Sequence, residues 1–203
     1  MNADRAKAGM GTSGVGGFAH NSTETEIKLA VPDLRTARRL LRAAGFTVSR
    51  RRVFESNVVF DTPGLTLRNS STLLRIRQAG KLTTVTYKGQ PTVGRHKSRE
   101  ELELAVTDAA MMSTVFERLG FRPVFRYEKY RTEYRQSAGA GMATVDETPV
   151  GLYLELEGTP AWIDRTAREM GFREQDYITS SYARLYLEWC HENHVKASNM
   201  VFG

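Results

Sequence analysis

The chain has 203 residues, enough for one domain or one domain with appendages, and its 40% hydrophobic content excludes a chain that is disordered throughout. Its formal net charge of +6 favours an anionic partner, and both nucleic acid and phosphate-rich small molecules meet that condition. The single cysteine, Cys190, excludes an internal disulfide and agrees with a cytoplasmic location. No run approaches the roughly 20 apolar residues of a membrane span, so no membrane partner is expected.

Three segments are predicted along the chain. Residues 1–21 are rich in Gly, Ala and Ser and lack the apolar stretch of a signal peptide, so we expect a flexible tail. Residues 22–192 are expected to form the folded domain, and residues 193–203 a C-terminal tail.

The predicted elements are runs of strands separated by helices. The first strand is expected from about Thr23 to Val31, and the helix after it is capped by Asp33 and ended by Gly45. Further strands are expected at 46–60, 72–78, 82–89, 98–106, 122–135, 142–147 and 151–157. Further helices are expected at 108–120, 160–170 and 178–192. The fold class is therefore predicted to be α+β.

Charged residues alternate with apolar residues in most of the predicted strands. In the first strand, Glu24, Glu26 and Lys28 share one face, while Ile27 and Leu29 take the other. Polar residues recur at alternate positions in six later segments: Arg75 and Arg77; Thr84, Thr86 and Lys88; Arg99, Glu101 and Glu103; Lys129 and Arg131; Thr144 and Asp146; Glu155 and Glu157. These seven short faces indicate that many charges converge on one site.

An internal repeat relates the two halves of the chain. Residues 26–31 (Glu-Ile-Lys-Leu-Ala-Val) resemble residues 101–106 (Glu-Leu-Glu-Leu-Ala-Val), and the same offset of 75 relates Asp33 to Asp108. Each half therefore begins with a strand, a helix and a strand. Two fused halves of about four strands predict an eight-stranded antiparallel β-barrel with helices packed outside, wide enough to hold side chains or one small ligand.

Alternation alone would place the charged faces in solvent, as in ordinary antiparallel sheets. Three observations favour the barrel interior instead. The helices need an apolar outer wall, the charged faces combine arginine with paired acids, and the candidate inward acids and bases nearly balance, seven against six. Enclosed charges must be paired, solvated or bound to ions, and carboxylates suit Mg²⁺ while Arg and Lys suit phosphate. A wet tunnel that holds metal ions and a polyphosphate would satisfy both sets.

The charged segments also form an ordered set of motifs. The set runs through Glu24-Thr25-Glu26-Ile27-Lys28, Leu74-Arg75-Ile76-Arg77, Thr86-Tyr87-Lys88-Gly89, Arg99-Glu100-Glu101-Leu102-Glu103, Tyr127-Glu128-Lys129-Tyr130-Arg131, Asp146-Glu147-Thr148-Pro149-Val150-Gly151, Glu155-Leu156-Glu157-Gly158 and Ser181-Tyr182. From about Thr23 to Trp189 it resembles the CYTH superfamily, or triphosphate tunnel metalloenzymes. That superfamily takes in class IV adenylate cyclases, thiamine triphosphatases and bacterial inorganic triphosphatases. The resemblance implies an eight-stranded antiparallel tunnel that binds triphosphate with Mg²⁺ or Mn²⁺.

The resemblance also implies a role for each charged position. The implied metal ligands are Glu24, Glu26, Glu155 and Glu157, with Asp146, Glu101 and Glu103 completing the acidic patch or binding a second ion. The implied triphosphate-binding residues are Lys28, Arg75, Arg77, Lys88, Lys129 and Arg131. Glu26 and Lys28 are the expected catalytic residues, although Lys28 could act as a base only if its pKa were lowered, and is otherwise a phosphate contact.

The expected function is metal-dependent hydrolysis of inorganic tripolyphosphate, thiamine triphosphate or a nucleoside triphosphate. The alternative is a class IV adenylate cyclase, in which the ribose 3′-hydroxyl attacks the α-phosphate; it is placed second because the sequence reveals no pocket for adenine and ribose. A second alternative is a non-catalytic polyphosphate- or RNA-binding module. Seven acids argue against a nucleic-acid surface, so a small-molecule triphosphate is the favoured partner. A homodimer is left open.

Four residues outside these motifs' charged positions carry weaker expectations. Arg50 and Arg52 either add to the phosphate site or form a solvated strand face. His96 lies in a polar loop beside Lys97 and Arg99; it either touches the tail of a substrate or, as we expect, is solvated. Tyr182 is expected to support the barrel from outside.

Overall fold

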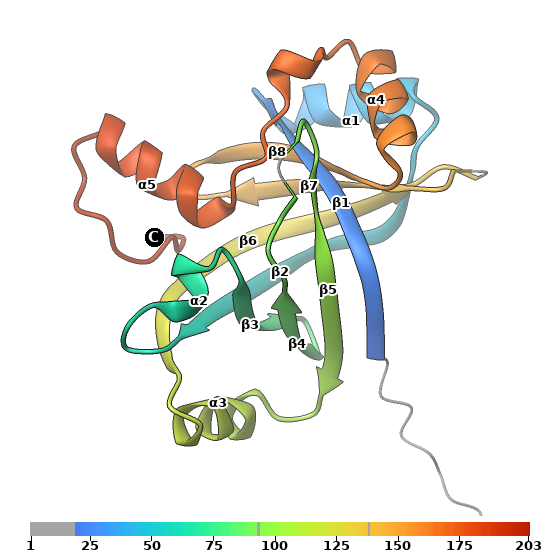
Figure 1. The fold of residues 1–203 in the computed structure, drawn as a ribbon. Coiled ribbons are helices and arrows are strands. Elements are labelled where there is room, and N and C mark those ends of the chain that lie inside the picture. Colours follow the sequence, from blue (N-terminus) through green and yellow to red (C-terminus); the bar gives the residue numbers. More distant parts are fainter. Residues whose placement is uncertain (1–18, 93, 138) are drawn as a thin grey trace, which may run out of the picture.

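The computed structural model describes residues 19–92, 94–137 and 139–203 (Figure 1). Most of the predicted N-terminal tail, up to residue 18, lies outside the described residues. The first strand, β1 (Ala19–Val31), begins before the predicted Thr23, so residues 19–21 belong to the sheet.

The described residues contain the predicted succession of strands and helices. The further strands are β2 (Thr47–Asp61), β3 (Leu73–Ala79), β4 (Leu82–Lys88), β5 (Lys97–Val106), β6 (Arg122–Arg135), β7 (Met142–Thr148) and β8 (Gly151–Glu157). The helices are α1 (Leu34–Ala43), α2 (Thr66–Asn69), α3 (Ala109–Arg118), α4 (Pro160–Glu169) and α5 (Tyr182–Glu192), with a 3₁₀ turn, η1, at Glu174–Asp176. The short α2 was not expected from the sequence.

The eight strands close into an antiparallel barrel, as predicted. Their order around the barrel is β1-β5-β4-β3-β2-β6-β7-β8, and each neighbouring pair is antiparallel. If each of the first four strands is exchanged with its counterpart among the last four (β1 with β5, β2 with β6, and so on), the same order is obtained, read in the opposite direction around the barrel. In keeping with this symmetry, Glu24 of β1 pairs with Arg99 of β5, its own counterpart 75 residues later.

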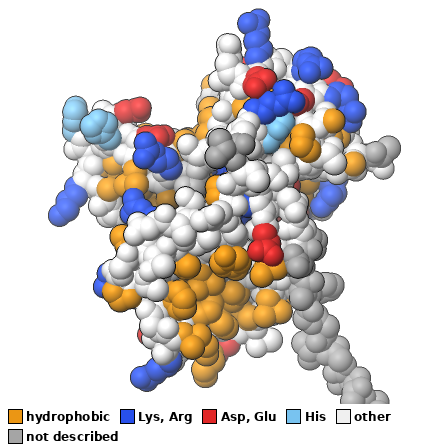
Figure 2. Space-filling view, in the orientation of Figure 1, with side chains coloured by type: hydrophobic (Ala, Val, Ile, Leu, Met, Phe, Trp, Pro, Cys, Tyr) orange, Lys and Arg blue, Asp and Glu red, His pale blue; other side chains and the backbone are white. Residues whose placement is uncertain are grey.

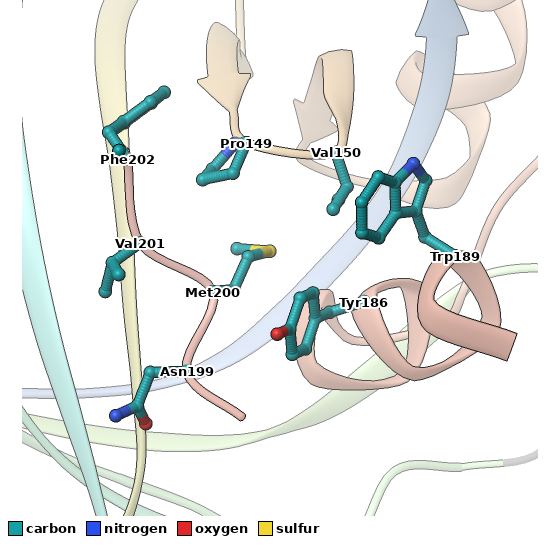
Figure 3. A pocket seen from close by; sticks show the side chains of 9 residues that line it. Pro149, Val150, Tyr186, Trp189, Asn199, Met200, Val201 and Phe202 are labelled. Atoms are coloured by element: carbon teal, nitrogen blue, oxygen red, sulfur yellow. The ribbon is translucent and has the colours of Figure 1, made fainter. Parts of the chain in front are cut away.

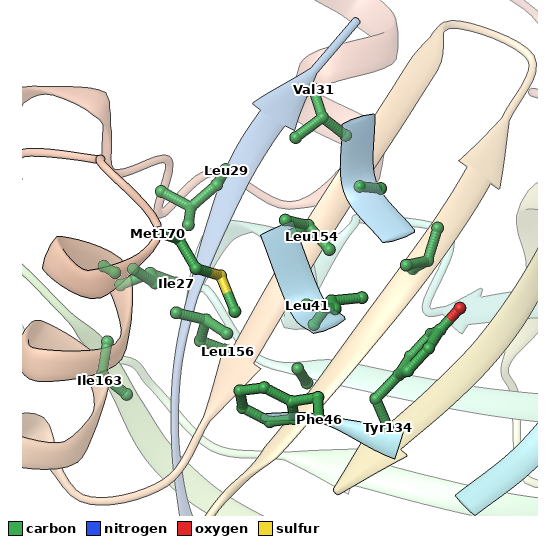
Figure 4. Close-up of a cluster of buried hydrophobic side chains, with 14 of the residues drawn as sticks. Ile27, Leu29, Val31, Leu41, Phe46, Tyr134, Leu154, Leu156, Ile163 and Met170 are labelled. Atoms are coloured by element: carbon green, nitrogen blue, oxygen red, sulfur yellow. The ribbon is translucent and has the colours of Figure 1, made fainter. Parts of the chain in front are cut away.

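The outward apolar faces are covered by helices on one side of the barrel. In Figure 1, α1 and α4 lie against β1, β7 and β8. Ile27 and Leu29 of β1 are completely buried there against Leu41 of α1 and Ile163 of α4 (Figure 4). At the helix start, Asp33 caps α1 as predicted, accepting a hydrogen bond from the Thr36 backbone N–H at 2.7 Å. The main hydrophobic core is therefore outside the barrel, which leaves the interior to the polar faces.

The end of the chain differs from its prediction. The last helix starts at Tyr182 rather than 178, because Ile178 pairs with the backbone of Lys28. The predicted C-terminal tail, 193–203, packs along β6: Met200 is fully buried, and its N–H donates to the Arg126 carbonyl at 3.0 Å. Between this segment, α5 and the β7–β8 turn lies a cavity of about 380 Å³, lined by residues such as Val150 (Figure 3).

The opposite side of the barrel keeps an exposed apolar surface. Leu102 and Leu104 of β5 are exposed, and so are Met111 and Leu119 near α3. Figure 2 shows a broad apolar area on the lower part of the molecule. In the described part of the chain, no helix is long and apolar enough to cross a membrane.

Candidate functional site

The barrel encloses a cavity of about 1070 Å³ lined by the alternating charged faces. Ten of the thirteen predicted site residues line it: Glu24, Glu26, Lys28, Arg75, Arg77, Lys88, Lys129, Arg131, Glu155 and Glu157. They come from β1, β3, β4, β6 and β8, whose order around the barrel brings distant sequence positions together around one cavity. The inward direction predicted for these side chains is confirmed.

The other three predicted residues do not line this cavity. Glu101 has Oε2 at 3.3 Å from Lys88 Nζ, and Glu103 accepts a hydrogen bond from the Thr86 hydroxyl at 3.0 Å. Asp146 is completely buried and contacts Lys129 and Arg131. These acids therefore contact the cations and threonine of the site rather than the cavity itself.

Lys28 lies between two of the carboxylates that line the cavity. Its Nζ is 3.2 Å from Glu26 Oε1 and 3.3 Å from Glu155 Oε1, since Lys28 and Glu155 are opposite each other across β1 and β8. Burial alone would lower the pKa of Lys28, but Glu26 and Glu155 outweigh burial and raise that pKa above its usual range. Lys28 is therefore protonated at neutral pH. A phosphate contact requires this charged form, whereas a general base requires the neutral amine.

Two of the cavity's cations, Arg77 and Lys129, contact an acid that was not predicted from the sequence. Glu55 on β2 is 1% exposed, and its Oε2 lies 3.7 Å from Lys129 Nζ and 4.0 Å from Arg77 Nε. Burial would raise its pKa, but Lys129 and Arg77 hold the pKa of Glu55 at about 2. In the sequence, Glu55 lacked a charged neighbour at two-residue spacing, since Val53 and Asn57 occupy those positions.

Lys97 lines the cavity and was not predicted as a site residue either. Its position in the sequence indicated the end of a polar loop, although it shares the strand face of Arg99 and Glu101 by two-residue spacing. Its Nζ is 3.2 Å from Glu26 Oε1. Burial and the nearby charges of Lys28 and Arg99 lower the pKa of Lys97 to about 8, against the opposing effect of Glu26. The cavity wall therefore holds an ammonium group that titrates near neutral pH.

His96 is buried rather than solvated, which corrects its prediction. Its Nε2 lies 2.7 Å from Asp164 Oδ1 on α4, and Arg95 Nη2 lies 2.8 Å from the other oxygen of that carboxylate. Tyr177 also donates to Asp164 at 3.3 Å. These contacts fasten the loop before Lys97 to α4.

Arg50 and Arg52 lie outside the cavity wall. Arg50 Nη1 is 3.2 Å from Glu133 Oε1, and Arg52 Nε is 2.7 Å from Glu147 Oε1. The Arg52 guanidinium also stacks over Tyr130, 3.4 Å from the ring centroid. The predicted alternative of a strand face outside the phosphate site is the one observed.

Tyr182 lies in the cavity wall instead of supporting the barrel from outside. It is 7% exposed, and its hydroxyl donates to Asp146 Oδ2 at 2.7 Å. Burial and the charge of Asp146 raise the pKa of this phenol well above its ordinary value, so the hydroxyl keeps its proton.

One end of the cavity is apolar and bordered by arginines. The apolar end consists of Val59, Leu65, Leu67, Phe125 and Leu187, and its arginines are Arg68, Arg122 and Arg184. Beneath it, Asp61 is buried and accepts the backbone N–H groups of Leu67 and Arg68, each at 2.9 Å. Asp61 therefore binds the backbone of α2 and does not pair with the three arginines, so the charge at the apolar end is positive.

The carboxylates meet one requirement of a divalent-cation site. Burial, and after it the charges of Glu24 and Glu101, raise the pKa of Glu157 to about 7, so this carboxylate lies close to other acids. Oxygen ligands of this kind suit Mg²⁺ and Mn²⁺. As the side chains stand, with lysines and arginines between them, no three His, Cys, Asp or Glu residues of the described ranges converge as ligands. The donor chemistry therefore fits a divalent cation, and the acids would have to exchange lysine contacts for it.

Comparison with known proteins gives one consistent result. Residues 22–201 match the CYTH domain family. A protein of Methanocaldococcus jannaschii, provisionally named an adenylate cyclase, is 32% identical over 135 residues, which are 66% of this chain and 75% of the relative.

Solved structures with the same fold are also found. A Pyrococcus horikoshii protein has a TM-score of 0.70 and 24% identity over 81% of this chain and 98% of its own. A provisionally named adenylyl cyclase from Hippeastrum, described as having a dominant triphosphatase activity, has a TM-score of 0.58 and 18% identity over 86% and 97% of the two chains. The family match over nearly the whole described chain and the closed barrel with its charged interior show that this protein belongs to the CYTH domain family.

Proposed function

We propose that this protein is a Mg²⁺- or Mn²⁺-dependent triphosphatase whose substrate carries an organic group on the triphosphate. The observation that carries the proposal is the barrel cavity, whose lining combines five bases, Arg75, Arg77, Lys88, Lys129 and Arg131, with the acids of β1 and β8. Hydrolysis of a phosphoanhydride requires charge neutralisation and in-line positioning more than covalent chemistry, and such a wall supplies both.

The cations and the carboxylates of the cavity would bind different parts of the metal–triphosphate complex. Arg75 and Arg131 offer planar guanidinium groups that bind phosphate oxygens in pairs, while Lys88 and Lys129 act as point charges. Glu24 and Glu157 are the carboxylates that would hold the divalent cation, and Glu24 would then exchange its contact with Lys88, at 2.5 Å, for the cation. When bound, that cation would neutralise phosphate charge and lower the pKa of a coordinated water.

The apolar end supports a substrate larger than inorganic tripolyphosphate. A cavity of about 1070 Å³ is at the upper end of the range for small-molecule sites. Leu67, Phe125 and Leu187 offer contacts to a flat organic group, which a chain of phosphates alone would not use. Arg68 and Arg122 favour a neutral or anionic group there, so a nucleoside fits better than the cationic ring of thiamine.

The same end is the observation that favours adenylate cyclase as the second candidate. A cyclase must hold adenine and ribose while the 3′-hydroxyl reaches the α-phosphate, and Val59, Leu65 and Phe125 border room for such a group. The charged residues are common to both reactions, so only the products separate them.

The test measures products from three substrates. The protein is incubated with tripolyphosphate, thiamine triphosphate and ATP, each with Mg²⁺ and with Mn²⁺, and phosphate, pyrophosphate and cyclic AMP are quantified. We expect phosphate release, fastest from ATP. Cyclic AMP with pyrophosphate and no free phosphate would establish the cyclase instead. Binding that survives EDTA, with no turnover of any substrate, would establish a binding module.

A pair of variants tests the organic group separately. Leu67→Ser and Leu187→Ser should raise the KM for ATP several-fold and leave the KM for tripolyphosphate unchanged, because only ATP reaches the apolar end. Leu104→Ser, on the exposed outer face of β5, is the control and should change neither value. Equal losses for ATP and tripolyphosphate would show that the apolar end only supports the fold.

A further inference from the structure

Tyr182 connects the last helix to the phosphate-facing lysines. It is the first residue of α5, and Ser181 before it caps the helix by accepting the Arg184 N–H. The aromatic ring lies on the cavity wall, with Lys28 Nζ at 5.2 Å and Lys129 Nζ at 5.0 Å from its centroid. Both ammonium groups are within the roughly 6 Å at which a cation is attracted to a ring face.

The Tyr182 hydroxyl is also connected to Lys129 through Asp146, because both groups donate to the same carboxylate oxygen. Asp146 Oδ1 accepts from Arg131 Nε at 2.7 Å, and Oδ2 accepts from Lys129 Nζ at 2.6 Å, Arg131 Nη2 at 2.5 Å and Tyr182 at 2.7 Å. A carboxylate offers about four acceptor positions, and these four contacts match that number, with three donors on Oδ2 and one on Oδ1. Asp146 is also completely buried, which agrees with a structural role.

We propose that Tyr182 is a positioning residue that sets the places of Lys28 and Lys129, and that Asp146 is the fixed counter-ion of Lys129 and Arg131 rather than a metal ligand. The inference rests on the proposed function only for its effect on triphosphate. Two contacts suit Tyr182 to this role, because the ring fixes the lysines from one side and the hydroxyl orients the carboxylate that holds Lys129.

The same arrangement makes the position of α5 matter to the site. Ala183 and Leu187 of α5 line the cavity, and the helix is followed by the segment that packs along β6. A shift of α5 would therefore move Tyr182, and with it Lys28 and Lys129.

The experiment compares three variants by calorimetric binding of tripolyphosphate in the presence of Mg²⁺. Tyr182→Phe keeps the ring and removes the hydroxyl, so we expect affinity to fall about tenfold, the size of a lost hydrogen bond to a charged group. Tyr182→Leu removes the ring as well and should weaken binding by a further several-fold. Tyr186→Phe, one turn later, loses a hydroxyl that contacts Ser198 away from the lysines, and should bind as the wild type does.

A second readout does not depend on triphosphate. The ring currents of Tyr182 should shift the side-chain methylene NMR signals of Lys28 and Lys129, and Tyr182→Leu should abolish these shifts while Tyr182→Phe and Tyr186→Phe keep them. Unchanged lysine signals in Tyr182→Leu, or equal affinity losses in Tyr182→Phe and Tyr186→Phe, would overturn the inference. If the wild type binds no tripolyphosphate but the lysine shifts behave as expected, the proposed function fails and the positioning role stands.

Discussion

Removal of Glu26 should destabilise the protein as well as impair its site. Glu26 is 7% exposed, and its Oε1 lies 3.2 Å from both Lys28 Nζ and Lys97 Nζ. Glu26→Ala would leave these buried ammonium groups short of a partner, and removing one member of a buried ion pair costs about 3–5 kcal/mol. Because Glu155 still contacts Lys28 at 3.3 Å, we expect the low end of that range, about 3 kcal/mol.

The pKa of Glu26 fixes the pH range of this effect. Burial alone would raise that pKa, but Lys28 and Lys97 outweigh burial and hold it below the usual 4.5. A carboxylate with a lowered folded-state pKa contributes its stability above the unfolded pKa and loses it as the pH falls through the folded value. The difference between wild type and Glu26→Ala should therefore be constant from about pH 5 to pH 7 and shrink below about pH 4.5.

Urea denaturation at pH 7 measures the difference. The midpoint should fall for Glu26→Ala with little change in the slope, because the same surface is exposed on unfolding. Glu169→Ala, on the exposed end of α4, is the control and should stay within about 0.5 kcal/mol of the wild type. A Glu26→Ala midpoint equal to that of the wild type would refute the reasoning, since it would mean that water already solvates both lysines.

Three more predictions concern other parts of the molecule. Because the pKa of Glu157 is raised to about 7, Mn²⁺ affinity measured by electron paramagnetic resonance should increase from about pH 6 to pH 8, and Glu157→Gln should flatten this rise. Asp164→Ala should leave His96 without its partner, lower the free energy of unfolding by about 1–3 kcal/mol and expose the preceding loop to protease; an intact loop would contradict this. Gly141→Ala should lower the melting temperature, since its Cβ would lie 2.5 Å from the Trp162 ring, and overpacking costs about 1–3 kcal/mol.

The barrel and its inward faces could be predicted because they depend on local alternation. Glu24 and Glu26 reach the interior for the same reason as Glu155: a strand with one apolar face turned to the helices must turn the other inward. The repeat indicated the number of strands, and Asp33 indicated where the first helix begins.

What the sequence could not show depends on contacts between distant segments. Register shifts in β2 between Arg50 and Val53 change which residues face inward, and such bulges have no clear signature in a list of charges. His96 is buried by a carboxylate 68 positions later, and Tyr182 enters the wall because α5 docks at the end of the barrel. None of these partners can be found from spacing alone.

The exchange symmetry of the barrel has a consequence for the direction in which a ligand lies. Two identical halves would offer a linear triphosphate two equivalent orientations, head to tail and tail to head. The charges break that equivalence: the third strand of the first half carries Arg75 and Arg77, whereas the third strand of the second half carries Thr144 and Asp146. Even the pair related by the repeat, Glu24 and Arg99, has opposite signs. A duplicated backbone with unduplicated charges thus gives the tunnel a polarity, so that even a symmetric phosphate chain would meet chemically different groups at its two ends.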